Sequence, residues 1–285
     1  MLEIKNLSHI YNPGTPFSRA ALDGVSLSVK KGEFICIIGH TGSGKSTLIQ
    51  HLNALLKPTS GSVLLDGEDI FADKSKLKSV RQRVGLVFQY PEHQLFEETI
   101  YKDVAFGPNN LGLAEEEVDA RVREALHLVG LPEEVYEKSP FELSGGQKRR
   151  AAIAGVLAMK PDVLILDEPT AGLDPAGRNA VLSQIAEMHK TVGNTVILIS
   201  HNMEDVSRLA DRIIVMAKGK IFLTGTPEEI FSEPEKLRKV GLAAPSISIL
   251  MDRLKKEGID VPSGIFTIEA ATNVLKEKIK IWEKS

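Results

Sequence analysis

The sequence predicts an α/β fold with a largely parallel sheet, because strand-like and helix-like segments alternate along most of its 285 residues. Several strand-like segments are continuous apolar runs, which is typical of strands buried on both faces of a parallel sheet. One such run, Phe34–Ile38, leads through a glycine-rich turn into a helical segment. This strand–turn–helix order is a recurring unit of such folds.

The elements alternate up to about residue 233. Apolar and β-branched runs predict strands at Ser26–Val29, Phe34–Ile38, Ser62–Leu65, Val84–Phe88, Val163–Leu166, Thr195–Ile199, Ile213–Met216 and Ile221–Thr224. Helical periodicity predicts helices at Lys45–Leu55, Ala114–Val129, Gly145–Met159, Pro175–His189 and Met203–Ala210. The segment Ser62–Asp66, followed by Gly67 and Glu68, predicts an antiparallel hairpin inserted early in the chain.

The chain changes character after about Glu233, where strand signals stop. Two apolar stripes at helical spacing flank the Gly- and Pro-containing segment Gly258–Gly264. They consist of Ile247, Leu250, Met251 and Leu254, and of Ile268, Ala271, Leu275, Ile279 and Trp282. We therefore expect an α/β domain over residues 1–233 and a helical appendage over residues 234–285. The appendage either covers the edge of the core or provides a dimer contact.

Composition narrows the class of protein. The formal net charge of −3 gives no basic field for coating nucleic acid, so we expect no nucleic-acid partner. The longest apolar runs are too short to span a bilayer, and the N-terminal residues lack the apolar core of a signal peptide. A single cysteine, Cys36, excludes an internal disulfide and fits a reducing compartment. We expect a cytoplasmic protein whose membrane role, if any, depends on a partner.

A phosphate-binding loop follows the strand Phe34–Ile38. The match to G-x-x-x-x-G-K-[ST] consists of Gly39, His40, Thr41, Gly42, Ser43, Gly44, Lys45 and Ser46. Its glycines allow backbone N–H groups to turn toward phosphate oxygens, and the following helix adds the partial positive charge of its N-terminus. In such a loop Lys45 bridges the β- and γ-phosphates and Ser46 ligates Mg²⁺.

Two carboxylates end the strand Val163–Leu166, at the edge of the sheet where ligands of open α/β sheets bind. We expect Asp167 to hold Mg²⁺ through water and Glu168 to polarise an attacking water molecule. A second candidate anion site lies at another helix N-terminus, formed by Leu143, Ser144, Gly145, Gly146 and Gln147. One nucleotide does not need two helix N-termini unless two chains share each nucleotide.

These segments, in this order, resemble the ATP-binding cassette family over most of residues 1–230. Gly39–Thr47 resembles its Walker A loop, Leu143–Gln147 its signature and Val163–Glu168 its Walker B strand. Single matches are the Q-loop Gln89, the D-loop Asp174, the switch histidine His201 and Tyr11, at the position of an adenine-stacking aromatic residue. The resemblance implies a P-loop NTPase domain, with a RecA-like core and antiparallel β and α-helical subdomains.

The same resemblance implies ATP and Mg²⁺ as cofactors and head-to-tail closure of two cassettes around ATP. Thr47 then belongs to the ATP site, and Gln89 touches the Mg²⁺ shell. Leu143–Gln147 contacts the ATP bound by the partner, and His201 contacts the γ-phosphate and the attacking water. Glu168 and His201 are the expected catalytic residues.

Within the family, the segment Phe88–Thr99, followed by Asp103–Pro108, resembles the ATPases of energy-coupling factor (ECF) transporters. The version with Tyr90, Glu97 and Glu98 resembles the second, or A2, type. The resemblance implies import of vitamins or transition-metal ions from a peripheral position on the cytoplasmic face of the cell membrane. It implies three partners: a second ECF-type ATPase, a transmembrane T subunit docking near Gln89–Asp103 and a substrate-binding S subunit.

A homodimer in place of the heterodimer remains open. We also hypothesise that an arginine of the T subunit pairs with an acidic surface formed by Glu92, Glu97, Glu98 and Asp103.

Other functions fit the sequence less well. DNA-repair cassettes carry long coiled-coil insertions, whereas Lys45 and Leu143 are 143 − 45 = 98 positions apart here with no sustained heptads. Translation factors carry two sets of motifs in one chain, and a metabolic kinase has no reason to contain Leu143–Gln147 or Asp174. A cobalt or nickel importer, or another ABC transporter outside the ECF group, remains an alternative.

Overall fold

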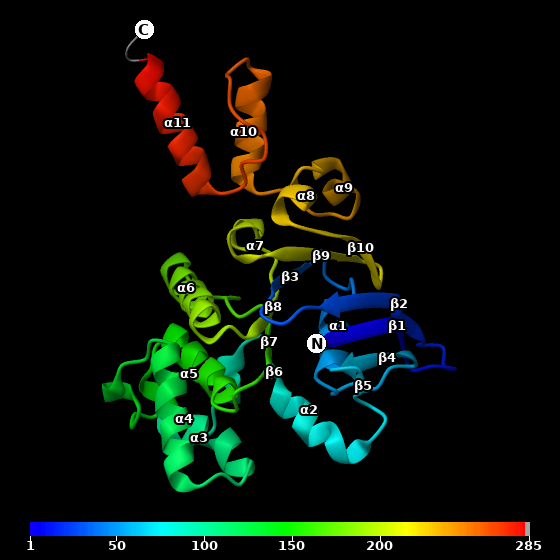
Figure 1. Ribbon diagram of the computed structural model, residues 1–285, viewed down its shortest axis with the longest axis vertical. Helices are drawn as coiled ribbons and strands as arrows, with labels where there is room; N and C mark the ends of the chain where they lie inside the picture. The colour runs from blue at the N-terminus through cyan, green and yellow to red at the C-terminus, as the bar shows by residue number, and fades with distance from the viewer. Residues whose placement is uncertain (283–285) are drawn as a thin grey trace.

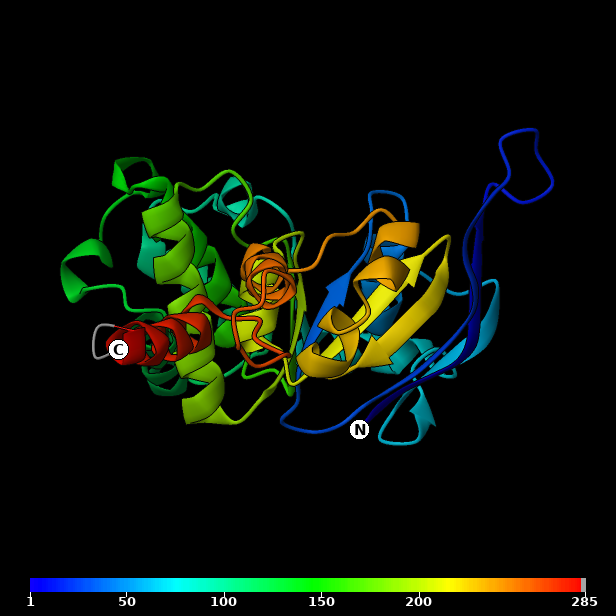
Figure 2. The same cartoon turned by 90° about the horizontal axis from the view of Figure 1, so that it is seen from above.

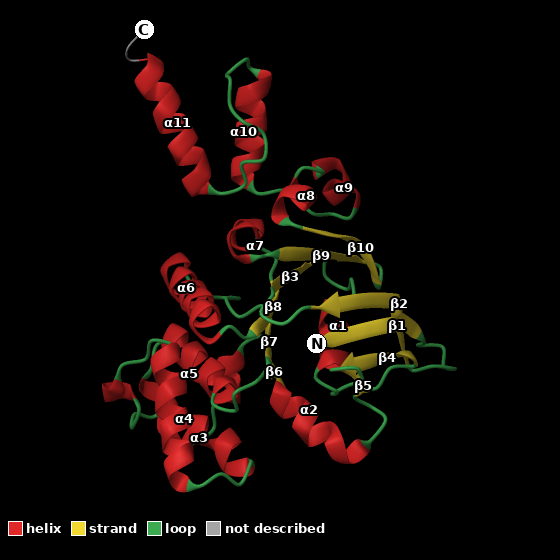
Figure 3. Cartoon of the chain, in the orientation of Figure 1, coloured by secondary structure: helices red, strands yellow, loops and turns green. Residues whose placement is uncertain are grey.

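The computed structural model describes residues 1–282, which form two sheets with one helix between them and most of the other helices beyond the larger sheet (Figures 1 and 3). The larger sheet has the strand order β10-β9-β3-β8-β7-β6. Its strands are β3 (Phe34–Ile38), β6 (Val84–Val87), β7 (Val163–Asp167), β8 (Thr195–Ile199), β9 (Arg212–Ala217) and β10 (Lys220–Gly225). Neighbouring strands run parallel except at the β9–β10 hairpin.

The smaller sheet is antiparallel and has the order β2-β1-β4-β5. It consists of β1 (Leu2–Tyr11), β2 (Arg19–Val29), β4 (Ser60–Leu65) and β5 (Glu68–Asp69). The hairpin expected after Ser62 is confirmed, since Leu65 pairs with Glu68. The sequence analysis missed β1, because polar residues interrupt the apolar alternation of this bulged strand.

Alternate residues of the central strands belong to two different cores. Ile35 and Ile37 of β3 pack with α1 (Lys45–Leu52) and with the smaller sheet. Cys36 and Ile38 pack on the opposite face, against most of the remaining helices. The two faces of the sheet are therefore both covered, which confirms the buried parallel strands inferred from the continuous apolar runs. Burial raises the pKa of the Cys36 thiol.

The second core lies among α3 (Ile100–Asn110), α4 (Glu115–Leu128), α5 (Gly145–Leu157), α6 (Pro175–Val192) and α7 (Met203–Leu209). Four of these helices were expected within a few residues of their observed bounds. The helices α2 (Leu77–Arg83), α3, α8 (Pro227–Phe231) and α9 (Pro234–Lys239) were missed. Pro108 inside α3 obscures its pattern, whereas Thr99 caps its start by accepting a hydrogen bond from Lys102 N.

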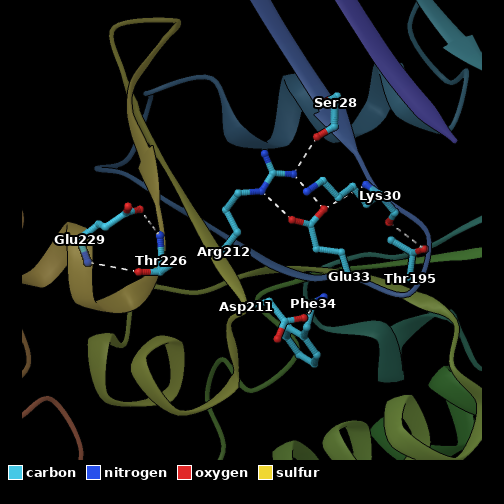
Figure 4. Close-up of polar contacts among 9 residues, drawn as sticks. All are labelled: Ser28, Lys30, Glu33, Phe34, Thr195, Asp211, Arg212, Thr226 and Glu229. Atoms are coloured by element: carbon cyan, nitrogen blue, oxygen red, sulfur yellow. Dashed lines mark hydrogen bonds and ion pairs between the residues drawn. The ribbon is translucent and has the colours of Figure 1, made fainter.

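Arg212 joins three strands at the N-terminal edge of β3 (Figure 4). Its guanidinium group donates to both carboxylate oxygens of Glu33 at 2.6 and 2.9 Å and to the carbonyl oxygen of Ser28 at 2.7 Å. Burial acts to raise the pKa of Glu33, but Arg212 and the Lys30 backbone hold it below its ordinary value. Asp211 also accepts a hydrogen bond from Phe34 N at 2.8 Å. These contacts fix the strand that enters the glycine-rich loop.

The C-terminal segment contains α10 (Ser246–Lys256) and α11 (Ile268–Trp282), which project beyond the sheets (Figures 1 and 2). Both predicted helices are present, and most of their described apolar residues, with Val261 and Ile265, form a separate small core. Leu250 and Ile268 depart from the expected stripes because they are 45% and 66% exposed. The side chains of Ile279 and Trp282 lie outside the described residues. No helix within residues 1–282 has the length and apolar character needed to cross a bilayer.

Candidate functional site

The loop between β3 and α1 is shaped by glycines that nothing larger could replace. Gly39, Gly42 and Gly44 have φ values of 157°, 80° and 103°. A Cβ atom at Gly39 would lie 2.4 Å from the carbonyl oxygen of Met216, and one at Gly44 would lie 2.6 Å from that of Ala21. The loop is therefore held between β9 and β2 in a backbone conformation that glycine adopts readily and other residues do not.

Lys45 begins α1 and is 6% exposed. Its Nζ donates hydrogen bonds to the carbonyl oxygens of Gly39 at 2.7 Å and His40 at 3.1 Å. Burial lowers the pKa of Lys45, while the carboxylates of Glu168 and Asp167 oppose that shift. The amine is therefore folded back over the loop and faces two acidic side chains.

Ser46 and Asp167 meet beside this amine. The hydroxyl group of Ser46 lies close enough to the carboxylate of Asp167, the last residue of β7, to act on its pKa. Burial raises the pKa of Asp167, and the Ser46 hydroxyl group and the charge of Lys45 oppose that shift. A hydroxyl group and a carboxylate are oxygen ligands of the kind that Mg²⁺ prefers, so the pair fits a magnesium site.

Glu168 adopts a left-handed backbone conformation with φ 49°, which is uncommon for a non-glycine residue. Its backbone N–H donates to the carbonyl oxygen of Ile199 at 3.1 Å, so the turn is tied to the end of β8. One carboxylate oxygen lies 2.5 Å from Nε2 of His201, and the other accepts a hydrogen bond from Gln89 at 3.4 Å. Three residues identified separately in the sequence therefore meet at one carboxylate.

Tyr11 lies at the other end of the loop, at the end of β1. Its hydroxyl group is 3.3 Å from Oγ1 of Thr47, and its ring packs edge-on against His9 at 4.5 Å. His9 in turn hydrogen-bonds His51 on α1. The sequence analysis missed both histidines, because only the folded chain brings them together. The structure thus brings Tyr11 to the first turn of α1.

The segment Leu143–Gln147 lies elsewhere, on the opposite face of the larger sheet from α1 (Figures 1 and 2). Ser144 caps α5 through a reciprocal pair of hydrogen bonds with Gln147. Leu143 is buried, while Ser144 and Gly145 are exposed. A Cβ atom at Gly145 or Gly146 would have no atom within 4 Å. Packing within the chain therefore does not explain why glycine occupies these two positions.

Asp174 caps α6, where its carboxylate accepts a hydrogen bond from Gly177 N at 2.7 Å. This cap is the contact that the structure gives to the D-loop residue. Sequence reasoning gave no role to Arg149, which lies on α5 and is 1% exposed. Arg149 forms a two-pronged ion pair with Glu92 and donates to the carbonyl oxygens of Pro169 and Ala171.

The expected acidic surface is not present as one surface. Glu92 pairs with Arg149, Glu98 pairs with Lys102 at 2.6 Å, and Asp103 accepts hydrogen bonds from Phe96 N and Glu97 N. The carboxylates were grouped because they are close in sequence, but each has its own partner or cap except Glu97. A groove of about 410 Å³ lies beside them, with an apolar lining that includes Leu95, Phe96, Phe106, Leu111, Val156 and Met159.

Comparisons with known proteins agree with this geometry. Residues 22–171 match the model of the ABC transporter family. The chain is 57% identical to the energy-coupling factor transporter ATP-binding protein EcfA2 of Clostridium tetani, over 99% of this chain and 97% of the relative. It is 58% identical to EcfA2 of Caldanaerobacter subterraneus, over 95% and 94% of the two chains.

Solved structures give the same result. The structure of cbiO1 from Clostridium perfringens, part of the ABC transporter complex cbiONQ, is 43% identical with a TM-score of 0.76, covering 88% of this chain and 98% of that one. A dimeric ATP-binding cassette in a post-hydrolysis state with ADP and phosphate is 31% identical with a TM-score of 0.71, covering 79% and 98%. The chain belongs to the ABC transporter family of ATPases, among the energy-coupling factor transporter ATP-binding proteins.

Proposed function

We propose that this chain is the A2-type ATPase subunit of an ECF importer and powers the uptake of a vitamin or a transition-metal ion. It would act at the cytoplasmic face of the cell membrane as a peripheral subunit. The observation that carries this proposal is the meeting of Gln89, Glu168 and His201 beside the phosphate loop, in a chain whose curated relatives are ECF ATPases. The transported substrate would be chosen by a separate S subunit.

In the proposed reaction, a water oxygen attacks the γ-phosphorus of ATP as the bond to the β–γ bridging oxygen breaks, giving ADP and phosphate. Glu168 accepts the proton of the water, and His201 orients Glu168 and hydrogen-bonds the γ-phosphate. Lys45 and the backbone N–H groups of the loop stabilise the charge on the phosphate oxygens. When bound, Mg²⁺ would neutralise charge between the β- and γ-phosphates, held by Ser46 and Asp167 with Gln89 at its edge.

The segment Leu143–Gln147 would act on ATP bound to a second cassette. Ser144, Gly145 and Gly146 present an exposed helix N-terminus, which favours an anion. The open space around both glycines supports close approach of a ligand from outside the chain. Two cassettes would then close head to tail around ATP, and loss of the γ-phosphate would release them. A first-type ECF ATPase is the proposed partner, and α10 and α11 the proposed additional dimer contact.

The T subunit would dock in the apolar groove between α2, α3 and α5. Phe96 and Phe106 are 64% and 47% exposed, and their rings pack edge-on at 5.0 Å. They would give an apolar helix of the T subunit a defined binding surface. Glu97, which follows Phe96 in the chain, would be the carboxylate that meets a cation of the partner. The groove adjoins the segment that contains Gln89, so a movement of that segment would be transmitted through Gln89 to the carboxylate of Glu168.

Purification of the intact complex in detergent tests this function. We expect a second ATPase, a T subunit and an S subunit to co-purify with the chain, each identified by mass. ATP turnover of the complex should not respond to DNA. Recovery of the chain without any membrane subunit, under conditions that preserve known membrane complexes, would contradict the proposal.

A further inference from the structure

The start of β2 lies directly against the phosphate loop. A Cβ atom at Gly42, in the middle of the loop, would lie 3.2 Å from Nη2 of Arg19. Arg19 is the first residue of β2, and it is exposed. Its guanidinium group therefore reaches the loop from the solvent side, whereas the amine of Lys45 is buried beneath it.

Arg19 is also the direct cross-strand partner of Tyr11. Opposed residues of an antiparallel pair project from the same face of the sheet, with Cβ atoms about 5 Å apart. Tyr11 contacts Thr47 at the start of α1, and Arg19 contacts the loop at Gly42. The pair therefore brackets the loop, with Arg19 at its middle and Tyr11 beside the first turn of α1.

The hairpin formed by β1 and β2 is anchored to α1 close to Tyr11 and Arg19. His51 on α1 is fully buried, and its Nδ1 lies 2.7 Å from the carbonyl oxygen of Thr47. Its Nε2 lies 3.1 Å from Nδ1 of His9, two residues before Tyr11. Only the tip of the hairpin, drawn in blue in Figure 2, projects away from the molecule. The base of the hairpin, with Arg19, is thus held in a fixed relation to α1.

Within the described part of the chain, Arg19 has no carboxylate partner. None of the ion pairs formed within residues 1–282 includes it. A guanidinium group presents five N–H donors in a planar fork that matches phosphate oxygens. Given the proposed function of the loop, the phosphate groups of a bound nucleotide would provide the counter-charge for Arg19.

We propose that Arg19 is a nucleotide-binding residue that donates hydrogen bonds to phosphate oxygens of the nucleotide bound in the loop. This inference rests on the proposed ATP site and adds to it a cation from the β1–β2 hairpin. Lys45 and Arg19 would then both bind the same phosphate chain, which distinguishes nucleotides from adenosine.

Affinity measurements on the purified full-length chain test the proposal. Arg19→Met keeps the apolar stem and removes the charge, whereas Arg19→Lys keeps the charge. We expect Arg19→Met to weaken ATP and ADP binding roughly tenfold at low salt, the effect of losing one charge-assisted hydrogen bond. The difference in nucleotide affinity between Arg19→Met and the unaltered chain should shrink at high salt. Adenosine, measured by competition with a fluorescent ATP analogue, should bind both forms equally, and Arg19→Lys should recover most of the ATP affinity.

Lys5→Met is the matched control, since Lys5 is an exposed cation on β1 that pairs with Glu3 at 3.2 Å. It should leave every affinity unchanged. Unaltered ATP affinity in Arg19→Met would overturn the proposal. So would an equal loss of ATP and adenosine binding, which would indicate a displaced Tyr11 and a purely structural role. If the unaltered chain itself binds neither ATP nor ADP, the proposed function of the loop fails, and the role of Arg19 fails with it.

Discussion

Nε2 of His201 lies 2.5 Å from Oε1 of Glu168. Glu168 follows β7 and His201 follows β8, two adjacent parallel strands whose carboxyl ends meet at one edge of the sheet. The left-handed turn at Glu168 raises its carboxylate out of the strand direction, toward His201 and Gln89. The geometry therefore gives this carboxylate two hydrogen-bonding neighbours that can fix its orientation.

Replacing Glu168 with Gln should uncouple ATP binding from hydrolysis. The amide keeps the shape of the side chain but cannot accept a proton from water, so we expect turnover to fall by about 10²-fold or more. ATP affinity should stay within a few-fold of the unaltered value, and a closed dimer should accumulate with ATP. Steady-state ATPase assays and size-exclusion chromatography measure both effects. Unchanged turnover would place the base elsewhere.

Replacing His201 with Ala removes the closer of the two neighbours of Glu168. We expect turnover to fall by roughly 10²-fold while ATP still binds, because the loop residues remain intact. Gln89→Ala should have a smaller effect, since its contact with Glu168 is longer, at 3.4 Å. Single-turnover kinetics with both variants would rank them. The proposed roles fail if Gln89→Ala slows hydrolysis more than His201→Ala does.

The core of the fold and most of the candidate site could be predicted from the sequence because their signals are local. A continuous apolar run such as Val163–Leu166 favours a doubly buried strand, and a glycine loop before a helix start defines the Lys45 site. The contacts of Arg149, His9 and His51 could not be predicted. Each depends on partners far along the chain, and a basic residue near a helix start usually faces solvent.

The division of the chain at residue 233 remains a prediction. Leu237 and Ala244, beyond that point, pack in the main core, whereas Met251 belongs to the separate C-terminal core.

The prediction that four carboxylates form one acidic surface was wrong because it relied on their closeness in sequence. Sequence proximity groups Glu92 with Glu98, but the fold turns Glu92 inward to Arg149.

Apolar contact, rather than acidic charge, should dominate docking of the T subunit. Phe106→Ser removes an aromatic wall of the groove, so we expect co-purification of the T subunit to fall at least tenfold. Charge reversal at Glu97 and Glu98 should have a weaker, salt-dependent effect, because Glu98 already pairs with Lys102. Val192→Ser, at a half-exposed apolar residue on α6, is the control. Loss of the complex only upon charge reversal would restore the acidic-surface hypothesis.

The Arg149–Glu92 pair should make stability depend on acid pH. Burial acts to raise the pKa of Glu92, but hydrogen bonds and charge from Arg149 hold it below its ordinary value of 4.5. Because the pKa of Glu92 is lower in the folded than in the unfolded chain, its contribution is fully present above about pH 4.5. That contribution is lost as the pH falls through the lowered pKa of the folded state.

Glu92→Gln leaves the buried guanidinium group of Arg149 without its counter-charge, so we expect a loss of about 3 kcal/mol in the free energy of unfolding at pH 7. The difference from the unaltered chain should narrow below pH 4.5, as Glu92 becomes protonated in the latter. Urea unfolding between pH 7 and pH 3.5 measures both. Glu98→Gln, at an exposed pair, should behave like the unaltered chain throughout. A difference that stays constant with pH would show that the ion pair does not govern the acid response.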